Sequence, residues 1–274
     1  MKHLLSLIIV FTSALASQAQ NIGIQLYSLR NQFPKDVPGT LALIKSWGIT
    51  EVEGGGTYGL SQDEFNKLLK ENGLKVVSVG ADFNDLDKDI DKIIKNAKAF
   101  GAKMVMCAWV PHDGDNFTLA DADKAIKVFN TAGEKLAKEG LTFCYHAHGY
   151  EFRKHENGTL FDYMAEKMNP KFANFEMDVY WVKESGTDPL KLFNKYSSRI
   201  KMMHLKDRKP GTPDSDSGHA DVETNVVLGS GDVGVAELIK AARKAGVKHY
   251  FIEDESSRVV DQVPQSLAFL KSIK

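Results

Sequence analysis

Short apolar runs that are typical of buried β-strands alternate along this chain with longer segments of helical periodicity. Eight such runs occur, and between them apolar residues recur at every third or fourth position. Parallel strands need a crossover connection, usually a helix, so this alternation predicts an α/β protein built on a parallel sheet. The apolar runs cover residues 21–28, 49–54, 75–81, 103–109, 141–148, 174–180, 200–207 and 249–255.

Eight units of this kind favour a (β/α)8 TIM barrel, a fold of about 250 residues, over an open doubly wound sheet. An open sheet of the dinucleotide-binding type would be expected to carry a glycine fingerprint after its first strand, and residues 24–32 contain no glycine. No linker or change in composition divides residues 20–274, so we expect one barrel domain. The expected helices cover residues 38–47, 61–69, 87–100, 121–139, 160–168, 189–196, 233–245 and 263–273.

The N-terminus has the composition of a secretory signal peptide. Lys2 precedes an apolar stretch over residues 4–16, and the small residues Ser17 and Ala19 suit a signal-peptidase site. The apolar stretch is shorter than a membrane-spanning helix requires, so we expect no stable membrane insertion. No cysteine follows the small residues, so we expect no lipobox and no lipid anchor. We therefore predict a cleaved signal peptide over residues 1–19 and a periplasmic or otherwise exported protein.

Charge and cysteine content narrow the classes of protein to which the chain can belong. The 35 Lys and Arg residues nearly balance the 36 Asp and Glu residues, which gives no electrostatic reason to expect nucleic acid as a partner. The two cysteines, Cys107 and Cys144, both lie in strand-like runs. Two cysteines make no disulfide framework, so we expect buried free thiols, with a bridge between neighbouring strands as the alternative.

Polar side chains occur near the ends of four successive strands, from the fifth to the eighth. The fifth strand carries His146 and His148, the sixth Asp178, the seventh His204 and the eighth Glu253. In such barrels the chemistry lies at the C-terminal ends of the strands, where these side chains would be buried without partners unless a ligand satisfied them. A divalent cation would do so, and mixed imidazole and carboxylate ligands suit Mn, Zn, Co or Fe, with Mg also considered.

The motifs around these residues resemble those of a known family. The carriers are YHAHGYEF (145–152), MDVYW (177–181), HLKDR (204–208), LGSGDVG (228–234) and FIEDE (251–255), in that order. In these motifs the chain is similar to the sugar isomerase/epimerase superfamily of xylose-isomerase-like TIM barrels. Its relatives include ketose 3-epimerases, inosose dehydratases and lyases that act on 3-keto-glycosides. The resemblance implies one divalent metal, with Asp178, His204 and Glu253 among its ligands.

The first metal ligand departs from the family pattern, because many relatives have glutamate on the fifth strand where this chain has His146. Either His146 binds the metal or Glu151 reaches back from the following loop. The resemblance also implies acid/base catalysis beside a carbonyl. We expect His148, Glu151 and Glu253 to take part in it, since a histidine titrates near neutral pH and Glu253 can ligate and also act as a base.

Other residues near the strand ends are candidates for contact with a sugar. Lys206 follows His204 on the same face of its strand, and Arg208 lies in the loop beyond. Trp109 and Trp181 are placed to stack on a pyranose, as is Tyr27, and His112 lies in a loop that can reach the site. Each of these has an alternative structural interpretation, as core packing or as solvated charge.

Two loops complete the prediction. The polar stretch over residues 208–225 is long enough to serve as a mobile flap over the pocket. The GSGDVG stretch (229–234) resembles a phosphate-binding loop but follows no obvious strand. We therefore interpret it as a turn in which Asp232 caps the next helix.

Together these features favour an exported, metal-dependent sugar isomerase or epimerase that abstracts a proton next to a carbonyl. Phosphorylated sugars are chiefly cytoplasmic, so the expected substrate is an unphosphorylated sugar or keto-sugar. One alternative is a lyase or hydratase that acts on 3-keto-glycosides in glycan breakdown, and another is a non-enzymatic periplasmic sugar-binding protein. An endonuclease of the same superfamily fits poorly, because it would need a His-rich cluster of several metals and a basic groove. The chain has only eight histidines and no excess of basic residues. A homo-oligomer is compatible with the sequence.

Overall fold

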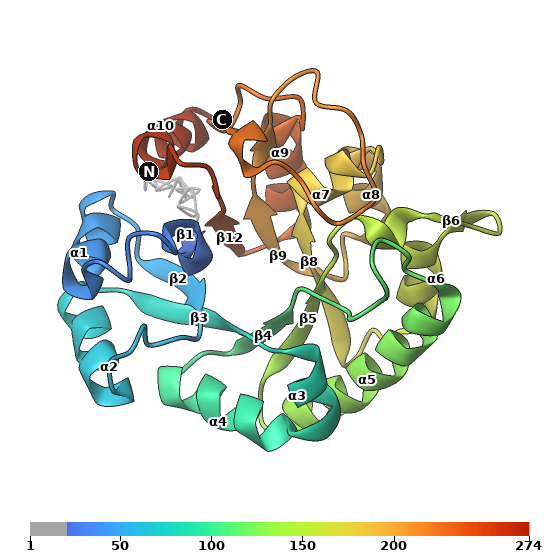
Figure 1. The fold of residues 1–274 in the computed structure, drawn as a ribbon, viewed down its shortest axis with the longest axis horizontal. Helices are drawn as coiled ribbons and strands as arrows, with labels where there is room; N and C mark the ends of the chain where they lie inside the picture. The colour runs from blue at the N-terminus through green and yellow to red at the C-terminus, as the bar shows by residue number, and fades with distance from the viewer. Residues whose placement is uncertain (1–20, 274) are drawn as a thin grey trace, which may run out of the picture.

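The computed structural model describes residues 21–273, so the predicted signal peptide of residues 1–19 lies outside the described residues. Eight parallel strands form a closed barrel in the order β1-β12-β9-β8-β5-β4-β3-β2 (Figure 1). This confirms the predicted TIM barrel. The strands are β1 (Asn21–Gln25), β2 (Glu51–Gly54), β3 (Lys75–Gly80), β4 (Met104–Cys107), β5 (Thr142–His146), β8 (Ala173–Asp178), β9 (Ile200–Leu205) and β12 (His249–Ile252).

Helices surround the barrel on its outer side (Figure 1). No helix of the described chain is long and apolar enough to cross a membrane. The loops contain short 3-10 turns and short strand pairs. The turns are η1 (Leu26–Leu29), η2 (Tyr150–Phe152) and η3 (Val222–Thr224). The strand pairs are β6 (Lys154–His155) with β7 (Gly158–Thr159) and β10 (Asp207–Arg208) with β11 (Asn225–Val226). The helices are α1 (Val37–Ser46), α2 (Gln62–Glu71), α3 (Phe83–Lys88), α4 (Ile90–Phe100), α5 (Leu119–Lys138), α6 (Leu160–Lys167), α7 (Val179–Glu184), α8 (Pro189–Tyr196), α9 (Val235–Ala245) and α10 (Val259–Ser272).

Side-chain caps determine where several helices begin. The capping box expected at Ser61 is present, with the Ser61 hydroxyl and the Glu64 side chain each bonded to the other residue's backbone N–H. The helix predicted over residues 87–100 is divided into α3 and α4, because Asp89 leaves helical geometry (φ −143°, ψ 59°) and its side chain caps Lys92 N–H. Periodicity alone does not reveal such an internal cap.

The barrel interior changes character along its axis. An apolar cluster holds Val77, Met106, Cys144, Met202 and Phe251. Nearer the C-terminal ends of the strands the interior becomes polar and buries Glu53, Glu176 and His204, among others. Cys107 and Cys144 are buried free thiols, as predicted. The polar layer follows from the period of two along each strand, which directs alternate side chains inward.

Close packing of α5 against the barrel requires a glycine. A Cβ atom at Gly133 would lie 2.5 Å from the Phe172 carbonyl oxygen, just before β8. We predict that Gly133→Ala lowers the free energy of unfolding by about 1–3 kcal/mol, the usual cost of overpacking, although alanine is the better helix former.

Urea unfolding followed by circular dichroism would measure this change. Thr131→Ala on the exposed side of α5 is the matched control and should leave stability unchanged or slightly higher. A stabilised Gly133→Ala variant would contradict the packing argument.

Candidate functional site

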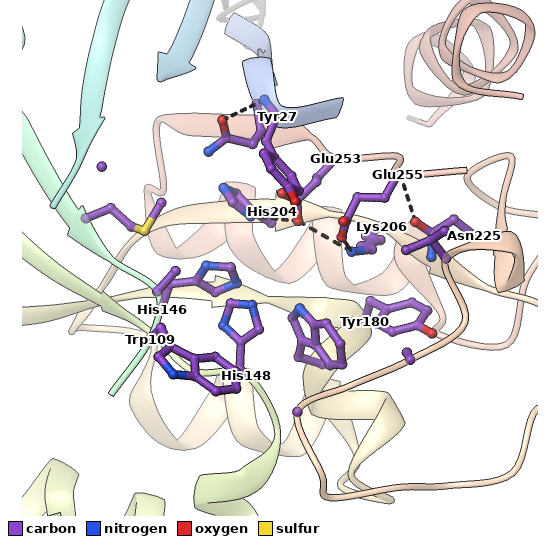
Figure 2. Close-up of a pocket in the computed structure, with 18 of the residues that line it drawn as sticks. Tyr27, Trp109, His146, His148, Tyr180, His204, Lys206, Asn225, Glu253 and Glu255 are labelled. Atoms are coloured by element: carbon purple, nitrogen blue, oxygen red, sulfur yellow. Dashed lines mark hydrogen bonds and ion pairs between the residues drawn. The ribbon is translucent and has the colours of Figure 1, made fainter. Parts of the chain in front are cut away.

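A pocket of about 620 Å³ opens at the C-terminal ends of the barrel strands (Figure 2). Its wall brings together residues from β1 to β5, β9 and α7 with residues of the loops that follow β2, β4, β5, β9 and β12. Eight of the residues predicted from the sequence line it: Tyr27, Trp109, His146, His148, Trp181, His204, Lys206 and Glu253. The predicted flap also contributes, through Gly218, His219, Ala220, Val222 and Asn225.

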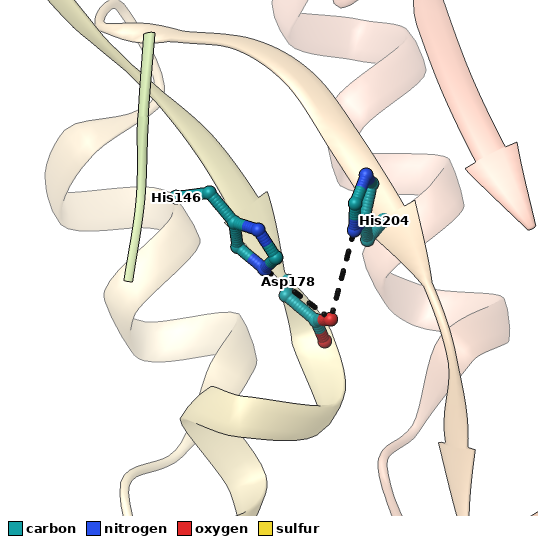
Figure 3. Close-up of side chains that lie close together, drawn as sticks. All are labelled: His146, Asp178 and His204. Atoms are coloured by element: carbon teal, nitrogen blue, oxygen red, sulfur yellow. Dashed lines mark ion pairs between the residues drawn. The ribbon is translucent and has the colours of Figure 1, made fainter. Parts of the chain in front are cut away.

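Three side chains at the base of the pocket form a candidate metal centre. His146, Asp178 and His204 each offer one ligand atom, and these atoms lie within 4.8 Å of one another (Figure 3). Asp178 Oδ2 lies 3.4 Å from His146 Nε2 and 3.8 Å from His204 Nδ1. Glu253 approaches the same centre, with its Oε2 3.3 Å from His204 Nδ1. The four residues come from β5, β8, β9 and β12 (Glu253 directly follows β12), which are neighbours in the barrel.

The hydrogen-bonding state of these residues fits a cation. Among the described residues, both ring nitrogens of His146, Asp178 Oδ2 and His204 Nδ1 are buried without a hydrogen-bond partner. Leaving such groups unpaired costs about 1–3 kcal/mol each, and one divalent ion among them would remove that cost. Mixed imidazole and carboxylate donors are typical ligands of Zn, Mn, Fe and Co.

Asp178 is held in place by the start of α7. Its Oδ1 accepts hydrogen bonds from the backbone N–H groups of Tyr180 (2.7 Å) and Trp181 (3.2 Å), as a helix N-cap. Because one oxygen is used in the cap, the other faces the two histidines. The motif MDVYW therefore places a ligand and, through Trp181, part of the pocket wall.

The electrostatics of the metal-free site are set by burial and by the excess of carboxylates. Burial and the nearby His204 lower the pKa of His146 to about 3, so its ring is neutral at pH 7. Burial favours a neutral His204, but Glu176 and Glu253 outweigh it and raise the pKa of His204. Burial opposes ionisation of Glu253, yet Lys206 and His204 hold its pKa well below the usual range. Binding of a cation would displace a proton from His204.

Lys206 is fixed in the pocket wall by charges and aromatic rings. Its Nζ atom forms ion pairs with Glu255 and, at 3.6 Å, with Glu253, and the side chain is 2% exposed. It lies 5.1 Å from the ring centroid of Tyr180 and 5.3 Å from that of Trp181. Burial alone disfavours the ammonium, but the two carboxylates raise the pKa of Lys206, so it stays charged. The predicted position of Lys206 at the pocket is therefore matched by the structure.

Glu151 does not lie among the residues that line the pocket, in contrast to the prediction of a catalytic role or metal ligation. Its carboxylate accepts hydrogen bonds from the Tyr145 hydroxyl and from the backbone N–H groups of His148 (3.1 Å) and Gly149 (3.0 Å). Burial raises the pKa of Glu151 to about 7. Glu151 thus supports the loop that carries His148, and the structure places His146, not Glu151, in the candidate metal centre.

Arg208 also does not lie where its predicted role in substrate binding would require. Its guanidinium bonds to Glu184 (3.1 Å), Asp214 (2.9 Å) and Asp232 (3.0 Å), and the residue does not line the pocket. These bonds use the planar donor set of arginine, which matches several carboxylates at once. Arg208 therefore ties the predicted flap to α7 and to the GSGDVG turn.

Asp207, which was not predicted from the sequence to have a role, holds the GSGDVG turn. Asp207 accepts hydrogen bonds from the N–H groups of Gly229 (2.8 Å), Gly231 (3.1 Å) and Val233 (3.2 Å). The expected cap by Asp232 is wrong, because α9 has Gly234 as its N-cap residue without a side-chain cap. The carboxylate of Asp207 occupies the N–H groups that a phosphate would otherwise bind.

Aromatic side chains form the rim of the pocket. Tyr27 is 55% exposed and Trp109 is 37% exposed, and Figure 2 shows them on different sides of the opening. His112 does not line the pocket but stacks on Trp109 with ring centroids 5.1 Å apart. His148 contacts both Trp109 and Trp181, at 5.8 Å and 5.0 Å between centroids. His112 thus supports the rim and does not reach the centre.

Several polar residues at the site were missed from the sequence. Gln25, Asn225 and Glu255 line the pocket, and Glu53 and Glu176 lie beneath it in the barrel interior. The period of two in residues 49–54 places Glu51 and Glu53 on one strand face, and that signal could have identified Glu53 as inward-facing.

The fold and this site define a (β/α)8 barrel protein with a candidate metal centre at the C-terminal end of the barrel. A sequence model of the xylose isomerase-like TIM barrel family matches residues 41–273, so the chain belongs to this family. The resemblance predicted from the motifs is thereby confirmed.

Individual relatives agree with this placement. Inosose dehydratase of Geobacillus thermodenitrificans strain NG80-2 is 33% identical over 141 residues, which are 51% of this chain and 41% of that enzyme. A sugar phosphate isomerase/epimerase of Parabacteroides distasonis ATCC 8503 superposes with a TM-score of 0.78 at 24% identity, covering 93% of this chain and 100% of that one. The IolI protein with a bound zinc atom superposes with a TM-score of 0.71 at 12% identity, covering 92% and 96%. At these identities the two structures show the shared fold.

Two variants distinguish the candidate first ligands. We predict that His146→Ala weakens the binding of Zn²⁺ or Co²⁺ by at least about 10-fold, because it removes a donor from the centre. Glu151→Gln should retain the metal, since its carboxylate faces backbone N–H groups instead. Competition with a chelating dye would measure both affinities, with circular dichroism to verify folding. Loss of metal in Glu151→Gln alone would reverse the assignment.

Proposed function

We propose that this protein is a divalent-metal-dependent sugar isomerase or epimerase that abstracts a proton from a carbon next to a carbonyl. The observation that carries the proposal is the set of buried, unpaired donor atoms of His146, Asp178 and His204 at the base of an open pocket. A protein that only bound a sugar would not need such a set. Membership of the xylose isomerase-like family and the isomerase/epimerase and dehydratase names of its relatives support an enzymatic role.

The metal would be held by His146, Asp178 and His204, with Glu253 beside them. The zinc atom in the IolI structure supports a divalent ion, and the donor set admits Zn, Mn, Co or Fe as well as Mg. When bound, such an ion acts as a Lewis acid that stabilises the negative charge developing on a carbonyl oxygen. The chain's own residues then have to orient the sugar and move its protons.

His148 and Glu253 are the groups placed to transfer protons. Figure 2 shows them on different sides of the pocket, so a sugar carbon held between them would present one face to each. Burial and the adjacent His146 lower the pKa of His148 to about 3, which leaves a neutral imidazole at pH 7. Glu253 is ionised at the same pH and can accept a proton. Epimerisation uses such a pair when one group accepts the proton and the other, first protonated from the solvent that enters the open pocket, returns a proton to the opposite face.

The pocket lining supports an unphosphorylated substrate. Among the described residues that line the pocket, Lys206 is the only lysine or arginine. Glu253 and Glu255 already neutralise its charge. A phosphate group would therefore meet carboxylates without a free Lys or Arg to balance it. Trp109, Trp181 and Tyr27 offer aromatic faces for a pyranose instead. The predicted export to the periplasm, which is part of this proposal, agrees with a free sugar or a keto-sugar.

A dehydratase or lyase acting on a keto-sugar is the second candidate. The observation that favours it is the 33% identity to an inosose dehydratase over half of this chain. Both reactions begin with removal of a proton beside a carbonyl, and they diverge when a neighbouring oxygen substituent leaves. The Lys206 ammonium, fixed in the pocket wall, can protonate such a leaving group.

Deuterium exchange distinguishes these reactions. Free sugars, keto-sugars and 3-keto-glucosides are incubated with the protein and Mn²⁺ in D₂O, and products are followed by NMR. We expect deuterium at a carbon next to the carbonyl with the substituents retained, as an isomerase or epimerase requires. Release of water or of the C1 substituent would establish the second candidate. Absence of any exchange across the panel and across several metals would reject proton abstraction.

Lys206 is expected to act on turnover more than on metal binding. Lys206→Met keeps most of the side-chain volume but removes the charge, so we predict a fall in kcat of about 10²-fold, as for loss of a preorganised electrostatic donor. The exposed neighbour Lys209 supplies the control, Lys209→Met, which should keep full activity. Unchanged kcat in Lys206→Met, measured with the substrate found by exchange, would remove Lys206 from the mechanism.

A further inference from the structure

We propose that Glu53, on β2, is a positioning residue that fixes the ring of His204 so that Nδ1 faces the metal. The proposal rests on the metal centre of the proposed function and adds a residue to it. Glu53 and His204 are both 0% exposed. Their strands, β2 and β9, are not neighbours, because β1 and β12 lie between them. The contact therefore reaches across the barrel interior.

The two nitrogens of His204 have different surroundings. Nε2 lies 2.6 Å from Glu53 Oε1, which is hydrogen-bond distance. Nδ1 points to the other side, 3.3 Å from Glu253 Oε2 and 3.8 Å from Asp178 Oδ2, and has no hydrogen-bond partner among the described residues. A histidine that donates Nε2–H to a carboxylate keeps the lone pair of Nδ1 for a ligand. Such a carboxylate also makes the ring a stronger ligand.

Glu53 is itself held by a second hydrogen bond. Gln25 Nε2 donates to the same Oε1 atom at 2.7 Å, and Gln25 Oε1 accepts from the backbone N–H of Tyr27 at 3.2 Å. The orientation of the Gln25 amide is therefore set by the backbone. A chain of bonds runs from the pocket rim at Tyr27 through Gln25 and Glu53 to His204.

A competing arrangement involves Glu176. Its Oε1 lies 3.4 Å from His204 Nε2, and among the described residues both of its carboxylate oxygens lack a hydrogen-bond partner. Glu53, Glu176 and His204 also form a group whose ligand atoms lie within 4.8 Å of one another. A cation there would use Nε2 as its ligand and exclude the Nε2–H donor. The two arrangements thus assign opposite roles to the nitrogens of His204.

Glutamine at position 53 should still hold the ring of His204, because Gln25 sets the orientation of the new amide. In Glu53→Gln, the Gln25 N–H donor favours the amide oxygen at the place of Oε1, where it still accepts from His204. We expect Glu53→Leu to weaken Zn²⁺ binding about 10–100-fold and Glu53→Gln to weaken it less than about 10-fold. The double variant Glu53→Gln/Gln25→Ala loses the orienting donor and should lose most of this rescue.

The test measures Zn²⁺ affinity by competition with a chelator, with circular dichroism to verify folding. Glu51→Gln is the matched control, since Glu51 lies on the same strand and contacts His249 Nδ1 at 2.8 Å, at the opposite end of the barrel. Its Zn²⁺ affinity should equal that of the wild type. If Glu53→Leu fails to fold, the comparison of Glu53→Gln with the double variant carries the measurement.

Histidine ¹⁵N NMR of the zinc-loaded wild type gives a second readout. We expect His204 to show a protonated Nε2 and a zinc-bound Nδ1. Zinc on Nε2, equal affinity in Glu53→Leu and wild type, or a loss in Glu176→Gln as large as that in Asp178→Asn would overturn the inference. If the wild type binds Zn²⁺, such a result leaves the proposed function standing, whereas a wild type that binds no divalent metal refutes both.

Discussion

The polar end of this barrel depends on the burial of more carboxyl groups than cationic groups around His204. Glu53, Glu176, Asp178 and Glu253 each have an oxygen within 4 Å of one of its ring nitrogens. Buried carboxylates are costly unless they are paired, hydrogen-bonded or protonated. One imidazolium and the nearby Lys206 do not balance them. Among the described residues, the carboxyl oxygens that lack a hydrogen-bond partner are what makes a divalent cation a physically reasonable occupant of the centre.

The barrel brings these groups together because neighbouring parallel strands end at the same edge. His204 lies in register with Asp178 on one neighbouring strand and with Phe251 on the other. Glu253 follows two residues after Phe251. The loops are then fixed by carboxylates that do not take part in the centre: Glu151 after β5, and Asp207 after β9. The motifs therefore contain two kinds of residue, those that face the pocket and those that hold its loops.

The sequence allowed the barrel and much of the centre to be predicted, because strand periodicity and strand order place side chains at a common edge. It did not separate pocket residues from loop supports. Glu151 and Arg208 occur in the same motifs as His148 and Lys206, and only the course of the loops directs them away from the pocket. The contact of Glu53 with His204 could not be predicted, because it joins segments 151 residues apart. No local spacing encodes a distance across a barrel.

For the proposed reaction, the same geometry defines the removal of the proton better than it defines the final product. In the proposed reaction, proton removal depends on the metal ligands and on His148 and Glu253, which lie just beyond the ends of β5 and β12. The subsequent choice between returning a proton to carbon and expelling an oxygen substituent depends on what lies beside that substituent. Lys206, whose Nζ atom is held between Glu253 and Glu255, is a charged donor in the pocket wall. Under the proposed function, the orientation of the sugar relative to Lys206, set by the aromatic rim, would decide between epimerisation and elimination.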